Sequence, residues 1–169
     1  MEAVADRRAN GLWVIVASFM VAMVLAIVPI PDSAPLEIAY LRPEWIVLVL
    51  LYWVMTIPSR VGIMIACLVG LFTDVLIGSL LGQHAIGYIA VAYIAASLYQ
   101  RLRMFSIWQQ SLVVFAAVGL NQLINVWIES IAGLTEWNIW YLLASVTSAL
   151  LWPWVFLLLR YLRRRFNVS

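Results

Sequence analysis

Six apolar stretches, separated by short breaks that contain charges, prolines or glycines, account for most of this 169-residue chain. A membrane-spanning helix needs about 20 predominantly apolar residues, and each stretch approaches or exceeds that length. The pattern therefore predicts an all-α, polytopic membrane protein, with one six-helix transmembrane domain over residues 1–169. The expected spans are residues 12–30, 44–58, 61–81, 85–100, 107–132 and 138–160.

The overall composition favours the same interpretation. Hydrophobic residues make up 66% of the chain and charged residues 11%, whereas a soluble globular domain is roughly half apolar and a quarter charged. The polar side chains are too few to cover a surface that faces water. The single cysteine, Cys67, excludes an intrachain disulfide and a cysteine-based metal cluster, and is expected to be a packing residue.

Arginine sets the expected orientation, because the chain contains no lysine. If the N-terminus is cytoplasmic, only Arg42 among the arginines falls outside the cytoplasmic segments, which is the positive-inside pattern. Both termini are then cytoplasmic. We expect the basic residues at the membrane surface to face anionic lipid headgroups, so no nucleic acid is needed to explain them. They are Arg60, Arg101, Arg103, Arg163, Arg164 and Arg165.

Two of the spans look short for a hydrocarbon core of about 30 Å. Residues 44–58 and 85–100 give helices of about 22 and 24 Å at about 1.5 Å per residue. Polar or glycine-rich segments, residues 42–45 and 78–84, flank them on the outer side. One interpretation is a recess on the outer face, lined by these segments. The alternative is that neighbouring leucines complete both helices.

Small residues recur at four-residue intervals along the third predicted helix, a spacing that lets helix backbones approach closely. This pattern predicts that the third span is a central, tightly packed helix. The residues are Gly62, Ala66, Gly70, Asp74, Gly78 and Gly82. A shorter stripe of Ser18, Ala22 and Ala26 follows the first span. Packing inside the protein is the preferred interpretation, and a docking face for a partner is the alternative.

Polar residues within the spans are expected to have a structural or functional role, because burying them in lipid is costly. Asn121, Asn125 and Glu129 form a stripe on the fifth span that must face protein or water. We expect Asn125 and Glu129 to contribute to the outer recess together with His84. A proton relay through Asp74, Glu44 and Glu129 is the alternative to a structural role.

The positive-inside pattern does not explain why Arg42 lies outside the cytoplasmic segments. We therefore expect Arg42 to form an ion pair with a structural role. An arginine can pair with a carboxylate through two parallel hydrogen bonds, so we expect Arg42 to bind Asp74, with Glu44 as a competing partner. The remaining residues do not form a catalytic arrangement. His84 is the single histidine and has no second ligand at metal-binding spacing. We therefore expect no enzymatic activity, no metal and no cofactor.

Several short motifs, spread over much of the chain, together resemble one known family. They are Arg42-Pro43-Glu44-Trp45, Tyr52-Trp53, Pro58, Arg60 and Gly62, then Gly70-Leu71-Phe72-Thr73-Asp74, Gly78-Ser79-Leu80-Leu81-Gly82-Gln83-His84, Gln100-Arg101-Leu102-Arg103 and Trp108-Gln109-Gln110. In this order they resemble MreD, the rod-shape-determining protein of the bacterial inner membrane. The resemblance is strongest over residues 42–110, and beyond residue 130 it is limited to hydropathy and the basic end.

The resemblance implies a non-enzymatic scaffold of the cell-wall elongation complex in the bacterial inner (cytoplasmic) membrane. The implied partners are MreC, RodA and a class B penicillin-binding protein, with MreB contacted indirectly or from the cytoplasmic side. Membrane lipids are expected as partners from the composition and the basic residues. The resemblance also implies a fold similar to the substrate-binding subunit of energy-coupling-factor transporters. A second function therefore stays open, that of a subunit which binds or transports a small molecule or lipid through an outward-facing recess.

Overall fold

The computed structural model describes residues 2–28, 41–133 and 139–168, and of residues 2–10 and 139 it describes the backbone only. Every regular element in these ranges is helical, which confirms the all-helical prediction. The elements are α1 (Glu2–Ile27), α3 (Trp45–Thr56), α4 (Ile63–Ile77), α5 (Gln83–Leu102), α6 (Ile107–Ile131), the 3-10 helix η1 (Ile139–Leu142) and α7 (Leu143–Arg165).

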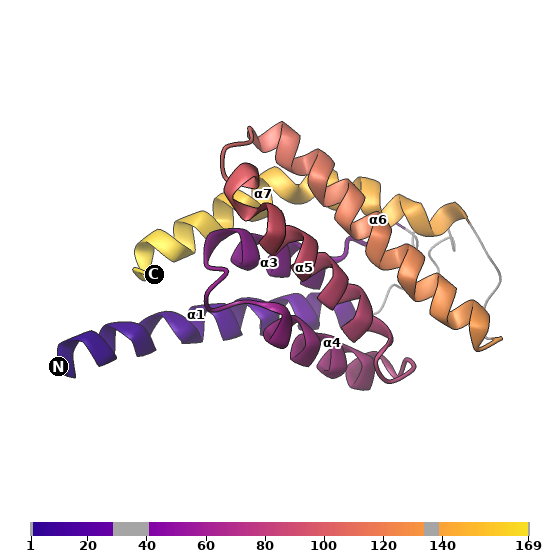
Figure 1. Cartoon of the computed structure of the whole chain (residues 1–169), viewed down its shortest axis with the longest axis horizontal. Coiled ribbons are helices and arrows are strands. Elements are labelled where there is room, and N and C mark those ends of the chain that lie inside the picture. Colours follow the sequence, from indigo (N-terminus) through magenta and orange to yellow (C-terminus); the bar gives the residue numbers. More distant parts are fainter. Residues whose placement is uncertain (1, 29–40, 134–138, 169) are drawn as a thin grey trace.

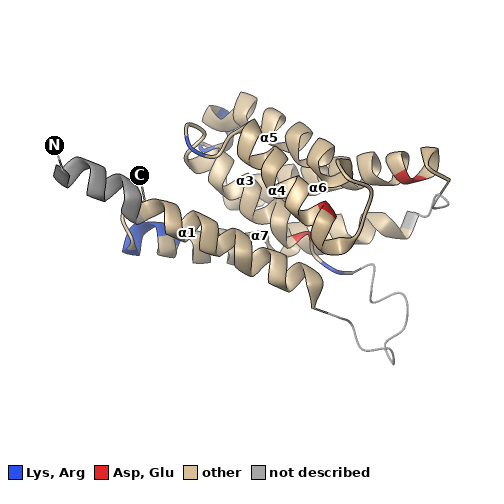
Figure 2. Ribbon diagram, turned by 90° about the horizontal axis from the view of Figure 1, so that it is seen from below, with Lys and Arg blue, Asp and Glu red and all other residues tan. Residues whose placement is uncertain are grey.

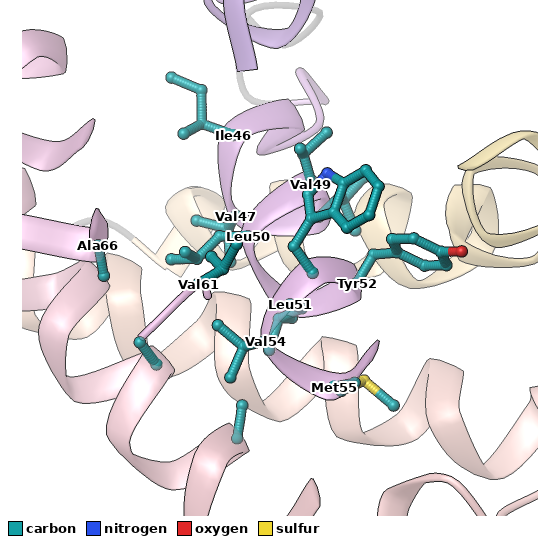
Figure 3. Close-up of a cluster of buried hydrophobic side chains, with 14 of the residues drawn as sticks. Ile46, Val47, Val49, Leu50, Leu51, Tyr52, Val54, Met55, Val61 and Ala66 are labelled. Carbon is teal, nitrogen blue, oxygen red and sulfur yellow. The ribbon is translucent and has the colours of Figure 1, made fainter. Parts of the chain in front are cut away.

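The short helix α3 forms the centre of the bundle. All of its residues from Ile46 to Met55 are buried, and it packs against α1, α5, α6 and α7. Figure 1 shows α3 and α5 between α1 and α4 on one side and α6 and α7 on the other. In Figure 3 the α3 side chains radiate in different directions, with Val47 and Leu50 on one side and Tyr52 on another. A helix that is apolar all round can be enclosed on every side.

The prediction that the third span is the central helix is wrong. Helix α4 buries one face, through Ala66, Val69, Gly70, Thr73 and Asp74. Its opposite face is exposed, with Met64 79% and Val75 70% accessible. The small residues of α4 mark one close contact with α5, and they do not require neighbours all around the helix.

Helix length confirms one of the two short spans. Helix α3 has 12 residues, or about 18 Å. Helix α5 starts at Gln83 and continues to Leu102, so it has 20 residues and is about 30 Å long. The prediction that this span is short is therefore wrong. The polar residues at its ends interrupt the hydropathy pattern but not the backbone hydrogen bonds that define a helix.

The glycines at four-residue spacing have different structural roles within α4 and after its end. At Gly70 the close approach is present, because a Cβ atom there would lie 2.6 Å from the backbone nitrogen of Ala85. Helix α4 ends at Ile77, so Gly78 and Gly82 belong to the turn before α5. Both have positive φ, +73° and +96°, and a Cβ on either would have no atom within 4 Å. The prediction that Gly78 and Gly82 pack against a helix is therefore wrong.

We expect the Gly78→Leu variant to be less stable than wild type, while Gly78→Asn stays close to it. The cause is the left-handed backbone at this residue, which costs most side chains about 1–2 kcal/mol and which asparagine adopts more readily. Thermal unfolding of the purified protein would measure the difference. Equal unfolding temperatures for the two variants would contradict this explanation.

The described surface is rich in large apolar side chains, while several polar side chains are buried. Large apolar side chains point outward, including Leu112 and Trp154, which are 70% and 74% exposed. Polar side chains lie inside, including Asn121 and Ser148, which are 0% exposed. Helix α6 and residues 140–165 are long and apolar enough to cross a membrane, and α3 and α4 are shorter apolar helices. These features are consistent with a membrane protein.

The charges are separated along the bundle. Figure 2 shows the arginines gathered mainly at the end that carries both termini, with the acidic residues in the opposite half. Arg101, Arg103, Arg164 and Arg165 are exposed. Arg60 differs from them, because its Nη1 is buried without a hydrogen-bond partner.

Candidate functional site

Asp74 holds the turn between α4 and α5. Its buried carboxylate accepts hydrogen bonds from Ser79 Oγ (2.9 Å), the backbone nitrogens of Gly82 (2.8 Å) and His84 (2.9 Å), and His84 Nδ1 (2.8 Å). The chain therefore wraps around one carboxylate as it leaves α4 and enters α5. Because a carboxylate only accepts hydrogen bonds, His84 must present its Nδ1 proton to Asp74.

The predicted pair between Arg42 and Asp74 is wrong. Arg42 Nη2 donates to the backbone oxygen of Leu25, 2.8 Å away in α1. Among the described residues, the ion pair within 4 Å joins His84 to Asp74. Donors within ten residues of Asp74 already fill its oxygens, and these local bonds form without closing a long loop of chain. The guanidinium of Arg42 instead reaches back to α1.

A cavity of about 350 Å³ lies beside this turn, where the recess was predicted. Its lining includes the whole segment 42–45 and, from the second predicted segment, His84. The other polar side chains that line it are Thr73, Tyr88, Gln122 and Tyr141. Residues of α1, α3, α4, α5, α6 and α7 meet here, so the cavity depends on the packing of the whole bundle.

Two residues that were expected in the recess lie elsewhere. Neither Asn125 nor Glu129 lines the cavity. Glu129 accepts a hydrogen bond from Gln83 Nε2 at 2.6 Å, which joins α6 to the start of α5. Asn125 is buried, and its Oδ1 has no hydrogen-bond partner. Both residues follow the expected face of α6, but that face is directed at α5 and not at the cavity.

The polar stripe of α6 faces protein, which is one of the two environments predicted for it. Asn121, Gln122 and Asn125 are all buried. Asn121 packs directly against Gly87 of α5, where a Cβ atom would collide with the Asn121 Oδ1. The contribution of Gly87 was not predicted. The sequence did contain a signal for this contact. The fourth predicted span has a small residue, and the fifth carries amide side chains that must avoid lipid.

The stripe on α1 also packs inside the protein. Ser18 Oγ accepts a hydrogen bond from Trp53 Nε1 at 2.9 Å, and Ala22 is buried. Ala26 is partly buried against the core and lines the cavity. This stripe therefore seats α1 on α3, and the alternative of a docking face does not apply to Ser18 and Ala22.

The segment 42–45 joins three helices. Arg42 bonds to α1, and the backbone nitrogen of Glu44 donates to Ser148 Oγ of α7 at 3.0 Å. Trp45 is the first residue of α3. The segment therefore fixes where the central helix begins and forms one wall of the cavity.

Comparison with known proteins identifies the family. The chain matches the family model described as rod shape-determining protein MreD over residues 7–162. It belongs to the MreD family. It is similar to the rod shape-determining protein MreD of Haemophilus influenzae, with 40% identity over 153 residues that cover 90% of this chain and 92% of the relative. No solved structure matches the chain. The family name describes a role in cell shape and not a chemical reaction.

Two further motif residues of this MreD protein, Gln109 and Gln110, have structural roles that were not predicted. Ser106 and Gln109 form a reciprocal capping box at the start of α6. Gln110 Nε2 donates to the backbone oxygen of Leu102 (3.1 Å), and its Oε1 accepts from Trp152 Nε1 (3.3 Å). A Ser-x-x-Gln sequence before an apolar run signals such a cap. The long-range bond from Gln110 to Trp152 had no local signal.

The described part of this MreD protein provides no metal centre. No group of three histidine, cysteine, aspartate or glutamate side chains lies close enough to hold a metal ion within these residues. The His84 ring instead bonds to Asp74 and contacts the edge of Tyr88, with ring centroids 5.9 Å apart. Its role in this geometry is to connect the turn to α5.

Proposed function

We propose that this MreD protein is a non-enzymatic membrane scaffold of the cell-wall elongation complex and is needed for rod shape. In this role it links MreC, RodA and a class B penicillin-binding protein, and reaches the MreB filament indirectly or from the cytoplasmic side. The supporting observation is that its polar motif residues form hydrogen bonds within the fold. Asp74, Gln109 and Gln110 hold turns and helices together, which is what a protein that positions its partners requires.

The proposal places the whole chain in the bacterial inner membrane as one six-span domain with both termini in the cytoplasm. The gathering of arginines at the end with the termini supports this orientation (Figure 2). The outward-facing apolar side chains of α4, α6 and α7 support burial in lipid. The proposed architecture is similar to that of the substrate-binding subunit of energy-coupling-factor transporters.

Cysteine labelling tests the orientation. In a Cys67→Ala background, an impermeant maleimide added to intact spheroplasts should modify Leu41→Cys but not Asn167→Cys, since both residues are exposed and lie on opposite sides of the proposed membrane. Both should react after the membrane is opened, which controls for reactivity. Labelling of Asn167→Cys in intact spheroplasts would reject the orientation.

Site-specific crosslinking in living cells tests the scaffold itself. A photoreactive residue would replace Met20 of α1, Val75 of α4, Leu112 of α6 or Trp154 of α7, which are all at least 61% exposed. We expect crosslinks to MreC or RodA from some of these helices and not from others, because a scaffold presents each partner with a defined face. If none of the four gives a product with an elongation protein in cells that keep their rod shape, the scaffold proposal is wrong.

A further inference from the structure

The wall of the cavity contains a buried acceptor without a donor. Gln122 of α6 is 8% exposed and lines the cavity. Its Oε1 is buried and has no hydrogen-bond partner. Nearly all buried polar groups in folded proteins have such a partner, so a ligand in the cavity that reached this oxygen would supply the missing donor.

A second acceptor lies beside the first. Glu44 lines the same cavity as Gln122, together with Arg42 and His84, and its side chain is close enough to all three to interact with them. The backbone nitrogen of Glu44 is held by Ser148, so this residue is fixed in place. A carboxylate next to an unpaired amide oxygen suits an ammonium group, which has three donors and no acceptor.

The same wall carries an opposite charge. Arg42 lines the cavity, and one of its nitrogens, Nη2, is anchored to the Leu25 backbone oxygen. Although Arg42 and Glu44 are two residues apart, they do not form an ion pair within 4 Å in the described structure. The other guanidinium donors of Arg42 can therefore bind a phosphate or carboxylate, which they do with favourable geometry.

We propose that the cavity binds a zwitterionic group in which a primary ammonium is joined by a short linker to a phosphate or carboxylate. The ammonium donates to Glu44 and Gln122 Oε1, and the anionic end accepts from Arg42. Trp45, Ile77 and Tyr88 supply the apolar part of the wall. The volume of about 350 Å³ lies at the small end of ligand pockets and suits a group of the size of phosphoethanolamine. The source is a lipid headgroup or a free small molecule.

Thermal unfolding of the full-length protein in detergent tests the proposal and separates the two sources. The free probe is glycerophosphoethanolamine, and the lipid probe is phosphatidylethanolamine in mixed micelles. Glycerophosphoglycerol and phosphatidylglycerol are matched controls, which carry the phosphate without the ammonium. A ligand that binds only the folded state raises its unfolding temperature. We expect a rise of a few degrees with an ethanolamine probe and none with the glycerol controls.

The two ethanolamine results identify the source. Stabilisation by both probes means that the headgroup alone is sufficient, so a free small molecule can be the ligand. Stabilisation by phosphatidylethanolamine alone means that the ligand is a lipid. No stabilisation by either probe, or equal stabilisation by the glycerol controls, would overturn the proposed zwitterion site.

Variants connect the binding to the cavity. We expect Glu44→Gln and Gln122→Met each to weaken binding of the stabilising probe by roughly tenfold or more. The first variant removes the negative charge that attracts the ammonium, and the second removes a hydrogen-bond acceptor for a charged group. Glu129→Gln is the matched control, because Glu129 lies on α6 outside the cavity, and it should bind as wild type does. If Glu44→Gln fails to fold, Gln122→Met decides the result. Wild-type affinity in the folded cavity variants would overturn the site.

The binding assay does not depend on the scaffold proposal. A protein that binds the zwitterion but forms no crosslink to an elongation protein would reject the scaffold and keep the site. A protein that forms the crosslinks but binds neither ethanolamine probe would do the reverse.

Discussion

Replacing Gly70 by leucine should prevent stable accumulation of the protein in the membrane. At this residue α4 and α5 touch through their backbones. A Cβ atom would lie 2.6 Å from the Ala85 nitrogen and 2.9 Å from the His84 carbonyl carbon. Neither backbone atom can turn away as a flexible side chain can, so the helices must separate. We expect a loss of about 3 kcal/mol or more in the free energy of unfolding, at or above the upper end of typical overpacking effects.

Another helical glycine provides the control for this variant. Gly119 lies within α6, and a Cβ atom there would have no neighbour within 4 Å. Gly119→Leu adds the same side chain to an apolar helix and should accumulate normally. Immunoblots of membranes and thermal unfolding of the purified proteins would measure both variants. Equal losses for Gly70→Leu and Gly119→Leu would show that leucine in a helix, and not the contact with α5, causes the defect.

Replacing Asp74 by alanine should have a comparable effect, for an electrostatic reason. The variant removes one carboxylate and leaves the backbone nitrogens of Gly82 and His84 without their acceptor. The His84 ring loses its ion-pair partner as well. Removing one member of a buried, hydrogen-bonded pair costs about 3–5 kcal/mol. We expect the turn between α4 and α5 to open, the unfolding temperature to fall, and the cell-shape function to be lost.

A double-mutant cycle distinguishes the observed partner of Asp74 from the predicted one. Asp74→Ala and His84→Ala should be strongly non-additive, because the two side chains share a hydrogen bond of 2.8 Å. Asp74→Ala and Arg42→Ala should be close to additive, because Arg42 bonds to Leu25 instead. Strong coupling between Arg42 and Asp74, without coupling between His84 and Asp74, would contradict this arrangement.

Gly70 and Asp74 act on the same part of the fold. Gly70 sets how closely α4 approaches the start of α5, and Asp74 holds the turn that connects the two helices. His84 follows that turn and lines the cavity. Damage to either residue should therefore deform the cavity, although Gly70 and Asp74 are not among its lining residues.

Hydropathy was sufficient to predict an all-helical chain. A continuous apolar run that is long enough for a helix indicates apolar surroundings along its whole length. The start of α3 at Trp45 and of α6 at Ile107 agrees with the predicted spans within one residue. The placement of Asn121 and Asn125 away from the outer surface also followed from sequence, since an amide in an apolar helix must avoid lipid, but the choice between protein and water did not. The motifs over residues 42–110 were sufficient to indicate the family.

Only the tertiary structure decided which helix is central and which polar groups meet. The small residues of α4 suggested a central helix, but a four-residue spacing reports close contact with one neighbour and not enclosure by several. Arg42 was expected to bind Asp74, yet each found a nearer partner, Leu25 for Arg42 and His84 for Asp74. Hydropathy along a chain is a local property that each residue carries with it. The choice among several possible hydrogen-bond partners depends on distances that exist only once all the helices have packed.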